Sequence, residues 1–377
     1  MRVLVLNPGS STLKAGVIEA GSSDPRRAPL AETTIEWLAD ADSDGDGEAI
    51  VRLALEEVGT AFEAVGYRVV HGGALHESAA PVDGQLIAGV EELDELAPLH
   101  NRRAATVMRA GLKSLPMLPH VACFDTAFHA TLPESVRRYP LPAEWVERYG
   151  LRRFGFHGLS VAWSVRRTAA LLGRPPNELD LVVAHLGSGC SVTAVSGGRS
   201  VDTSMGFTPL EGLMMGTRAG SVDPGMLLHL SANGVSHADL ADGLARRSGL
   251  LAVGGTSDVR ELQRRADAGD LAATLALEMF ARRAAAGIAV AASALDRVDA
   301  VVFTGGIGAH ASAVRSAIVD RLWVLGIAEA LAKDPPDSVL HPGPPAVVTV
   351  LAREDAVIAD EVAALLQDES PTEAMRS

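Results

Sequence analysis

The sequence predicts an α/β protein made of two similar halves, and three observations support this prediction. The chain has 377 residues, which is more than one hydrophobic core usually serves, so two domains are expected. Short apolar runs alternate with alanine-rich segments of helical spacing, an order typical of α/β folds. A strand–turn–strand pattern near the start also recurs in the middle of the chain. We therefore expect a duplicated domain with a cleft between its halves.

The recurring pattern is an apolar run, a turn containing Gly and Ser, and a second apolar run. Its first copy covers residues 3–18, and its second copy, LVVAHLGSGCSVTAV, covers residues 181–195. Aligned without gaps, the two copies place Val17 on Val195. Each copy is expected to form two strands joined by a tight polar turn.

Further apolar runs predict strands, and further alanine-rich periodic segments predict helices. The expected strands are 67–70, 120–124, 301–304 and 347–351. The expected helices are 48–58, 102–110, 160–172, 271–295 and 312–322. A segment rich in Pro and Arg, 133–153, is the expected connection between the halves. We expect one domain over 1–150 and another over 151–358, with a C-terminal helix over 359–377 packing back on the first.

Composition restricts the class of function. The formal net charge is −14, which argues against binding nucleic acid because a polyanion would be repelled. The longest apolar stretches contain Arg, Glu or Asp within 18 residues, so no membrane-spanning helix is expected. Only Cys123 and Cys190 are present, which excludes a disulfide framework. We expect a cytoplasmic protein without nucleic-acid or membrane partners.

Three turns rich in Gly and Ser follow apolar strands. They are Asn7–Lys14, His185–Gly189 and Thr304–Gly308. Such turns present backbone N–H groups, which suit phosphate oxygens. One of them alone is usually only a turn, but three at strand ends favour a nucleotide site.

Two arginines occupy unusual positions for a charged side chain. Arg68 lies inside an apolar strand, and Arg218 lies in a loop flanked by glycines. Burying an unpaired charge is costly, so each arginine needs an anionic partner. That partner is either an internal carboxylate or a bound carboxylate or phosphate, and two such arginines in an acidic protein favour a bound anion.

Histidines and carboxylates complete the candidate set. His100, His157 and His185 follow or open polar turns, where imidazole can donate or accept a proton near neutral pH, although each alone is more often structural. Asp125 ends an apolar run and Glu354 follows another. Such a pair of acids could hold Mg²⁺ together with substrate phosphates. For Glu354 the alternative is an acid in the first turn of the last helix.

These residues resemble the acetate kinase family, part of the acetate/propionate kinase group in the actin-like ATPase superfamily. The resemblance extends from Val3 to about Ala359 and rests on LVLNPGSSTLK, RVVHGG, FDTAFH, RRFGFHG and DTSMGFTPLEGLMMGTRAGSVDPG. It implies duplicated actin-like (ribonuclease H-like) domains with an active-site cleft between them, and a homodimer. It also implies reversible phosphoryl transfer between ATP and acetate, giving acetyl phosphate and ADP, with Mg²⁺ or alternatively Mn²⁺.

The resemblance also assigns residues by role. The implied catalytic residues are Asp125, Arg68, Arg218 and His157. The implied acceptor site is Arg68 with an apolar pocket of Val70, Leu99, Phe156 and Pro209. The implied metal-linked residues are Asn7 and Glu354. The implied nucleotide contacts are Ser10, Thr12, Lys14, His100, His185, Gly187, Ser188, Gly189, Asp258, Val259, Arg260, Gly306, Ile307, Gly308 and His310.

Two departures from the family pattern concern the phosphoryl donor. Ser188 stands where the family has Asn, and Ala309 with His310 stands where it has Glu and Asn. A kinase using a non-adenine or pyrophosphate donor is therefore one alternative to an ATP-dependent acetate kinase. A propionate kinase is another, because a small apolar pocket discriminates weakly against one additional methylene. A nucleotide-binding scaffold without kinase chemistry is a third hypothesis, but it has no need of a second anion site.

Overall fold

The computed structural model describes residues 1–9, 12–22, 27–37, 44–59, 61–97, 100–327 and 336–368. The chain divides into two compact units. Unit 1 comprises Met1–Ala130 and Arg353–Ser377, and unit 2 comprises Thr131–Ala352. The domain boundaries expected after residues 150 and 358 differ from those of the two units, which lie after residues 130 and 352. Tyr139 of the connecting segment bonds to Glu211 of unit 2, and the last helix begins at Glu354.

Unit 1 is built on a six-stranded mixed sheet in the order β3-β2-β1-β4-β6-β5. Its strands are β1 (Arg2–Pro8), β2 (Thr12–Glu19), β3 (Ala31–Glu36), β4 (Ala64–Val69), β5 (Ala80–Pro81) and β6 (His120–Phe124). Strands β1, β4 and β6 are parallel to one another, and the other pairings are antiparallel. The carboxyl ends of the three parallel strands therefore meet at one edge, which is the usual place for a ligand.

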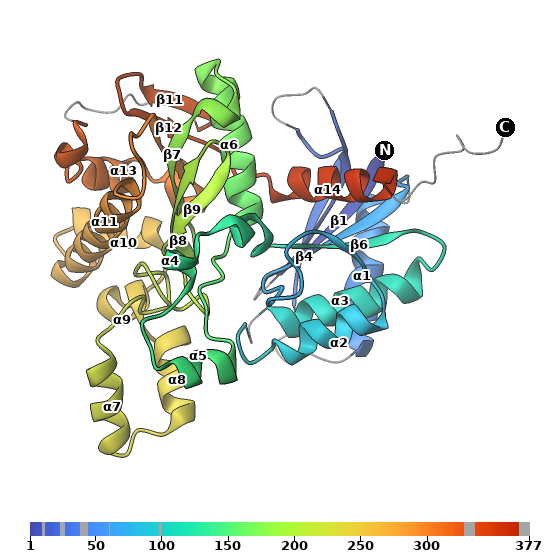
Figure 1. Ribbon diagram of the computed structural model, residues 1–377, viewed down its shortest axis with the longest axis horizontal. Coiled ribbons are helices and arrows are strands. Elements are labelled where there is room, and N and C mark those ends of the chain that lie inside the picture. Colours follow the sequence, from blue (N-terminus) through green and yellow to red (C-terminus); the bar gives the residue numbers. More distant parts are fainter. Residues whose placement is uncertain are drawn as a thin grey trace. The chain divides into compact units, whose positions relative to one another are not determined.

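Helices cover both faces of this sheet. Figure 1 shows α14 (Glu354–Asp368) on one face, and α1 (Asp44–Val58) and α3 (Asn101–Ser114) on the other, with α2 (Gly84–Glu92) against α3. The approach of α14 is close at Gly66, where a Cβ atom would lie 2.6 Å from Ile358 Cγ2 and 2.9 Å from Val362 Cγ2. Only glycine leaves room for the helix to lie directly on β4.

Unit 2 contains a second six-stranded sheet, in the order β11-β12-β10-β7-β8-β9. Its strands are β7 (Asp180–Leu186), β8 (Cys190–Ser196), β9 (Arg199–Thr203), β10 (Ala300–Thr304), β11 (Ser338–His341) and β12 (Ala346–Thr349). Helices α6 (Gly158–Leu172) and α11 (Leu271–Ala292) cover its two faces (Figure 1). The remaining helices are α4 (Glu134–Arg137), α5 (Ala143–Tyr149), α7 (Pro224–Ala232), α8 (His237–Arg246), α9 (Gly249–Gly254), α10 (Val259–Asp267), α12 (Gly305–His310) and α13 (Ser312–Val319).

The two sheets have the same topology, which confirms the predicted duplicated α/β fold. Strands β1, β2, β3, β4, β5 and β6 correspond in order and direction to β7, β8, β9, β10, β11 and β12. The gapless alignment of the two hairpins needs one correction. Pro8 pairs with Leu13 across the first turn, whereas Leu186 pairs with Cys190 across the second. The second turn is thus one residue shorter, and the returning strand is displaced by one position.

The strands and helices expected from the sequence are present, with their ends moved by a few residues. The expected strand 67–70 is the second part of β4, and the expected helix 271–295 ends earlier, at Ala292. The sequence did not predict the short edge strands or helices α7 to α10. Within the described ranges, none of the helices is long and apolar enough to cross a membrane.

Candidate active site

A cluster of charged side chains lies at the carboxyl edge of the parallel strands in unit 1. Arg68, on β4, donates from Nη2 to Asp125 Oδ2 at 2.6 Å and from Nε to Oδ1 at 3.1 Å. The same guanidinium donates from Nη1 to Asn7 Oδ1 at 3.3 Å, and its Nε lies 3.6 Å from Glu354 Oε2. Asn7 closes the cluster by donating from Nδ2 to that Glu354 oxygen at 3.1 Å. The structure thus brings these four predicted site residues together.

Burial and charge act against each other at Arg68. The side chain of Asp125 is 0% exposed, and those of Arg68 and Glu354 are each 14% exposed. Burial disfavours the guanidinium cation, but the two carboxylates more than offset this, so the pKa of Arg68 is raised. Arg68 therefore stays cationic throughout the physiological range. The sequence left two possible anionic partners for Arg68, an internal carboxylate and a bound anion. The structure shows the internal carboxylate.

The cluster also fits a magnesium ion. Its donors besides Arg68 are oxygens of Asp125, Glu354 and Asn7, the ligand type that Mg²⁺ prefers. In the described part of the chain, no group of three or more His, Cys, Asp or Glu side chains could enclose a metal. Mg²⁺ commonly takes one or two carboxylates and completes its shell with water and substrate phosphates. The residues present match that pattern.

Other predicted residues of unit 1 lie beside these strands. Val70 is buried directly after β4, and His100 is the N-cap residue of α3. Lys14 pairs in register with Asn7 across the first hairpin and has an exposed side chain, while Thr12 opens β2. Ser10 and Leu99 fall outside the described residues.

In unit 2 two histidines stack at the start of α6. The rings of His157 and His185 are 4.1 Å apart between centroids and nearly parallel. His157 Nδ1 lies 2.9 Å from Ser191 Oγ, and His185 Nδ1 lies 2.8 Å from Ser160 Oγ. His157 has a backbone φ of 59°, a left-handed conformation that costs free energy and is concentrated at functional sites.

Arg218 lies beside the same histidine. A Cβ atom placed on Gly189 would be 3.2 Å from His157 Nε2 and 3.6 Å from Arg218 Nη1. Arg218 also donates from Nη1 to the Pro209 carbonyl at 3.3 Å. Burial lowers the pKa of Arg218, with Cys190 opposing the effect. The structure thus places both Arg218 and His157 against Gly189 of the second glycine turn.

The second and third turns of unit 2 are adjacent. A Cβ atom on Gly187 would lie 3.9 Å from the backbone nitrogen of Gly306. Gly306, Ile307, Gly308 and His310 belong to the short helix α12 rather than to an open turn. Thr304, its N-cap residue, is fully buried, and among the described residues its hydroxyl has no hydrogen-bond partner.

The predicted adenosine-side segment forms the start of α10. Asp258 is the N-cap residue and accepts the backbone N–H of Arg260 at 2.8 Å. The Arg260 side chain lowers the pKa of Asp258 to about 2. Val259 is buried, and the preceding Ser257 lies next to Gly216, whose N–H donates to the Ser188 carbonyl at 3.2 Å. Asp258 thus has a structural capping role whether or not it contacts a nucleotide.

Sequence reasoning missed the groups that orient these residues. Ser160 and Ser191 contact the two histidines, and each follows its glycine turn by a few residues in GFHGLS and HLGSGCS. That spacing is the signal that could have found them. Tyr139 and Glu211 gave no such signal, because they come from segments far apart in the sequence.

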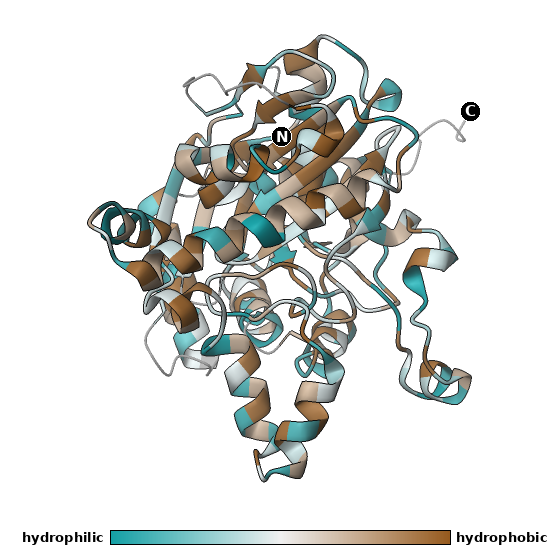
Figure 2. Cartoon of the chain, turned by 90° about the vertical axis from the view of Figure 1, so that its left-hand side faces the viewer, coloured by the Kyte–Doolittle hydropathy of each residue, from teal (hydrophilic) through white to brown (hydrophobic). Residues whose placement is uncertain are grey.

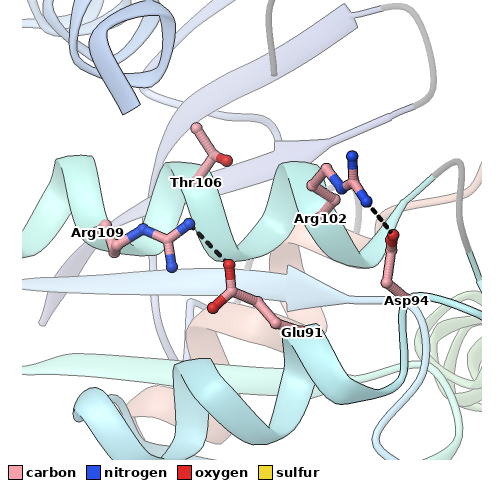
Figure 3. Close-up of a pocket in the computed structure, with 5 residues that line it drawn as sticks. All are labelled: Glu91, Asp94, Arg102, Thr106 and Arg109. Atoms are coloured by element: carbon pink, nitrogen blue, oxygen red, sulfur yellow. Dashed lines mark hydrogen bonds and ion pairs between the residues drawn. The ribbon is translucent and has the colours of Figure 1, made fainter. Parts of the chain in front are cut away.

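Unit 1 also has a polar pocket that contains none of the predicted site residues. It has a volume of about 360 Å³ and lies between α2 and α3 (Figure 3). Two ion pairs line it, Arg102 with Asp94 at 2.9 Å and Arg109 with Glu91 at 2.8 Å. Because each arginine already has a carboxylate partner, the pocket offers no excess charge to a ligand.

Comparisons with known proteins find similarity over most of the chain. A sequence model described as the Acetokinase family matches residues 46–360. An acetate kinase of Deinococcus radiodurans is 42% identical, over 97% of this chain and 98% of its own length. An acetate kinase of Streptomyces coelicolor is also 42% identical, over 87% and 86% respectively.

Solved structures with a similar fold are named as kinases of two short carboxylates. A propionate kinase from Francisella tularensis has a TM-score of 0.82 and 32% identity, covering 96% of this chain and 98% of its own. The acetate kinase of Porphyromonas gingivalis has a TM-score of 0.80 and 32% identity, covering 97% and 99%.

The Arg68 cluster leads to a stability prediction. Arg68→Ala should lower the free energy of unfolding by about 3–5 kcal/mol, because the buried Asp125 loses the guanidinium that bonds both its oxygens. Urea denaturation followed by circular dichroism measures the loss. Arg260→Ala is the matched control, since its pair with Asp258 has the same chemistry but a 92% exposed guanidinium. It should lose nothing measurable, and equal losses in the two variants would contradict the prediction.

Proposed function

The chain belongs to the acetokinase family, and on that premise we propose that it transfers a phosphoryl group reversibly between ATP and acetate, with Mg²⁺. The observation that supports this most is the cluster of Arg68, Asp125, Glu354 and Asn7 at the carboxyl edge of three parallel strands. The cluster combines an arginine that stays cationic with carboxylates that can hold a metal ion. Phosphoryl transfer uses both kinds of group to position the reactants and to neutralise charge.

The proposed reaction is an in-line displacement. An oxygen of acetate forms a bond to the γ-phosphorus of ATP while the bond from that phosphorus to the β,γ-bridging oxygen breaks, releasing ADP. Acetate is already ionised near neutral pH, so the step needs no general base. The contribution of the protein is then to position the reactants and to neutralise charge.

Each unit supplies a part of this machinery in our proposal. Arg68 orients the acceptor carboxylate, and the shared Asp125 and Glu354 oxygens fix the direction in which its guanidinium points. Arg218 and His157 stabilise the charge on the transferring group. Asn7 and Glu354 would hold Mg²⁺, which when bound neutralises charge on the nucleotide phosphates.

The acceptor pocket is proposed to favour acetate, followed by propionate. Val70 and Phe156 are buried apolar residues of the two units, and Pro209 is buried beside Arg218. Leu99, the fourth expected lining residue, is outside the described residues. One additional methylene changes selectivity by only about 1–3 kcal/mol, and a relative of similar fold is a propionate kinase. Propionate is therefore the second candidate acceptor.

ATP is the proposed donor, and the glycine turns of unit 2 support it. Gly187 and Gly306 lie close together at the ends of neighbouring strands β7 and β10. Other donors are also tested because Ser188, Ala309 and His310 depart from the family pattern. His310 ends α12, and its side chain is exposed.

The proposed location is the cytoplasm. ATP is a cytoplasmic metabolite and both cysteines are buried thiols, which supports this location.

The first test of this function is formation of acyl phosphate, trapped with hydroxylamine. ATP with acetate should give the fastest trapping, with propionate second and butyrate third, and removal of Mg²⁺ with a chelator should abolish it. GTP and pyrophosphate, assayed in parallel, test the donor. A butyrate optimum would refute the proposed pocket, and absence of acyl phosphate with every donor would refute the kinase proposal.

Arg218→Ala tests the charge-stabilising role in unit 2. Loss of one such contact should lower kcat by on the order of a hundredfold, equivalent to about 3 kcal/mol. Initial rates of acyl phosphate formation measure the effect. Arg246→Ala, at an exposed arginine of α8, is the control and should keep normal turnover. Near-normal kcat in Arg218→Ala would show that the residue has no catalytic role.

We also propose that the chain forms a homodimer through α7. None of the residues of α7 or α8 is buried, although α7 carries Met226, Leu228 and Leu230, all exposed. Figure 2 shows hydrophobic positions, in brown, along the helix pair at the bottom of the view. An exposed apolar helix of this kind usually marks an interface, and most soluble homo-oligomers pair the same patch on two copies.

Light scattering on the purified protein tests the dimer. The wild-type chain, of 39.2 kDa, should show twice this mass, and Leu228→Glu should convert it to monomer because two charges would face each other across the interface. Leu228 is 73% exposed, so the substitution should leave the fold intact. Leu75→Glu, at an even more exposed leucine of unit 1, should remain dimeric. An unchanged mass in Leu228→Glu would exclude α7.

A further inference from the structure

Side chains from two separate segments of unit 2 meet at Glu211. The Tyr139 hydroxyl donates to one oxygen of the Glu211 carboxylate, and Arg153 Nη2 donates to the other at 2.9 Å. The same hydroxyl accepts the backbone N–H of Phe207 at 2.9 Å. The Arg153 guanidinium also lies 5.5 Å from the centre of the Tyr139 ring. The Tyr139 hydroxyl oxygen thus links the Glu211 carboxylate to the backbone at Phe207, in the loop that leads to Glu211.

Arg153 extends this network to the beginning of the same loop. Its Nη1 faces the carbonyl oxygens of Thr203, Ser204 and Met205 at 3.3, 3.3 and 3.0 Å. A guanidinium can satisfy several acceptors at once because its donors form a rigid planar fork. Arg153 therefore holds the first residues of the loop while its other nitrogen holds Glu211 at the end.

The loop closes so tightly that a side chain at residue 206 would push the Glu211 carboxylate and the Tyr139 hydroxyl apart. A Cβ atom on Gly206 would lie 1.7 Å from Glu211 Oε2 and 2.0 Å from the Tyr139 hydroxyl oxygen. Burial, and then the hydrogen bond to Glu211, raise the pKa of Tyr139. The hydroxyl therefore keeps its proton, and remains a donor, throughout the physiological range.

The closed loop makes two contacts with segments that carry proposed site residues. The Pro209 carbonyl, inside the loop, accepts the hydrogen bond from Arg218 Nη1 at 3.3 Å. The Gly206 carbonyl accepts the N–H of Phe154 at 3.0 Å, two residues before the buried Phe156. A change in the loop would therefore displace both the Arg218 guanidinium and one wall of the apolar pocket.

We propose that Tyr139, Arg153 and Glu211 are positioning residues that fix loop 204–211, and thereby set the place of Arg218 and the size of the acceptor pocket. The three do not act on the reactants themselves. This inference rests on the proposed function, since that function assigns Pro209 to the acceptor pocket and Arg218 to the transferring phosphoryl group. It predicts that weakening the network alters the choice of acceptor more than the use of the nucleotide.

Tyr139→Phe is the sharpest test, because it removes one oxygen and keeps the ring. The KM for acetate should rise about tenfold, since a displaced wall of the apolar pocket binds the small acceptor poorly. The KM for ATP should stay within about twofold of wild type, and the ratio of kcat/KM for acetate over propionate should fall. If Tyr139 only stabilised the fold, Tyr139→Phe would change neither the KM for acetate relative to the KM for ATP nor this ratio.

Two further variants separate positioning from general damage. Tyr149→Phe makes the same chemical change at a 59% exposed tyrosine of α5, and should behave as wild type. Glu211→Gln keeps an acceptor oxygen for Tyr139 and should retain more acetate selectivity than Glu211→Ala, which keeps none.

A measurement without substrate tests the loop directly. Hydrogen exchange followed by mass spectrometry should show faster exchange of residues 204–211 in Tyr139→Phe, with α8 unchanged. Unchanged exchange there, or unchanged acetate KM and selectivity in an active Tyr139→Phe enzyme, would overturn the inference. A wild-type protein that makes no acyl phosphate would refute the proposed function instead, and the exchange result would still decide whether the three residues fix the loop.

Discussion

The contact between Arg68 and the two carboxylates beside it determines much of the structure. A guanidinium inside an apolar strand is tolerated only because Asp125 and Glu354 lie within its reach. These carboxylates come from the end of β6 and the start of α14, while Asn7 comes from β1. One side chain therefore ties three strands and the last helix together at the edge where parallel strands end. Structure and proposed chemistry depend on the same interaction.

The duplication shows how one framework serves two kinds of site. Through the strand registers, Arg68 of unit 1 corresponds to Thr304 of unit 2, and Asp125 corresponds to Ala352. The same edge thus carries an ion cluster in one unit and small, mostly uncharged residues in the other. A charged edge suits an ionic acceptor and a metal, whereas a small-residue edge lets backbone N–H groups approach phosphates. The two copies share a topology and differ in their electrostatics.

Local sequence was sufficient for the fold class and for the strands that end in site residues. Arg68 within an apolar run required an anionic partner, but the sequence favoured a bound anion, whereas the structure supplies the internal carboxylate of Asp125. The link from Asn7 to Glu354, 347 residues apart, could not be predicted from any local pattern. The polar edge strands lack a continuous apolar run, and α7 leaves Leu228 and Leu230 exposed. Those elements depend on tertiary or quaternary contacts.

The last helix belongs to one unit but follows the final strand of the other. Helix α14 packs on β1, β2, β4 and β6. It covers the sheet at Gly66 and supplies the Glu354 carboxylate. During synthesis the first sheet must therefore leave the ribosome with one face bare and Arg68 incompletely paired. It stays so until nearly the whole chain has been made. A product terminated before Glu354 would expose that apolar face, which makes it a natural substrate for chaperones and proteases.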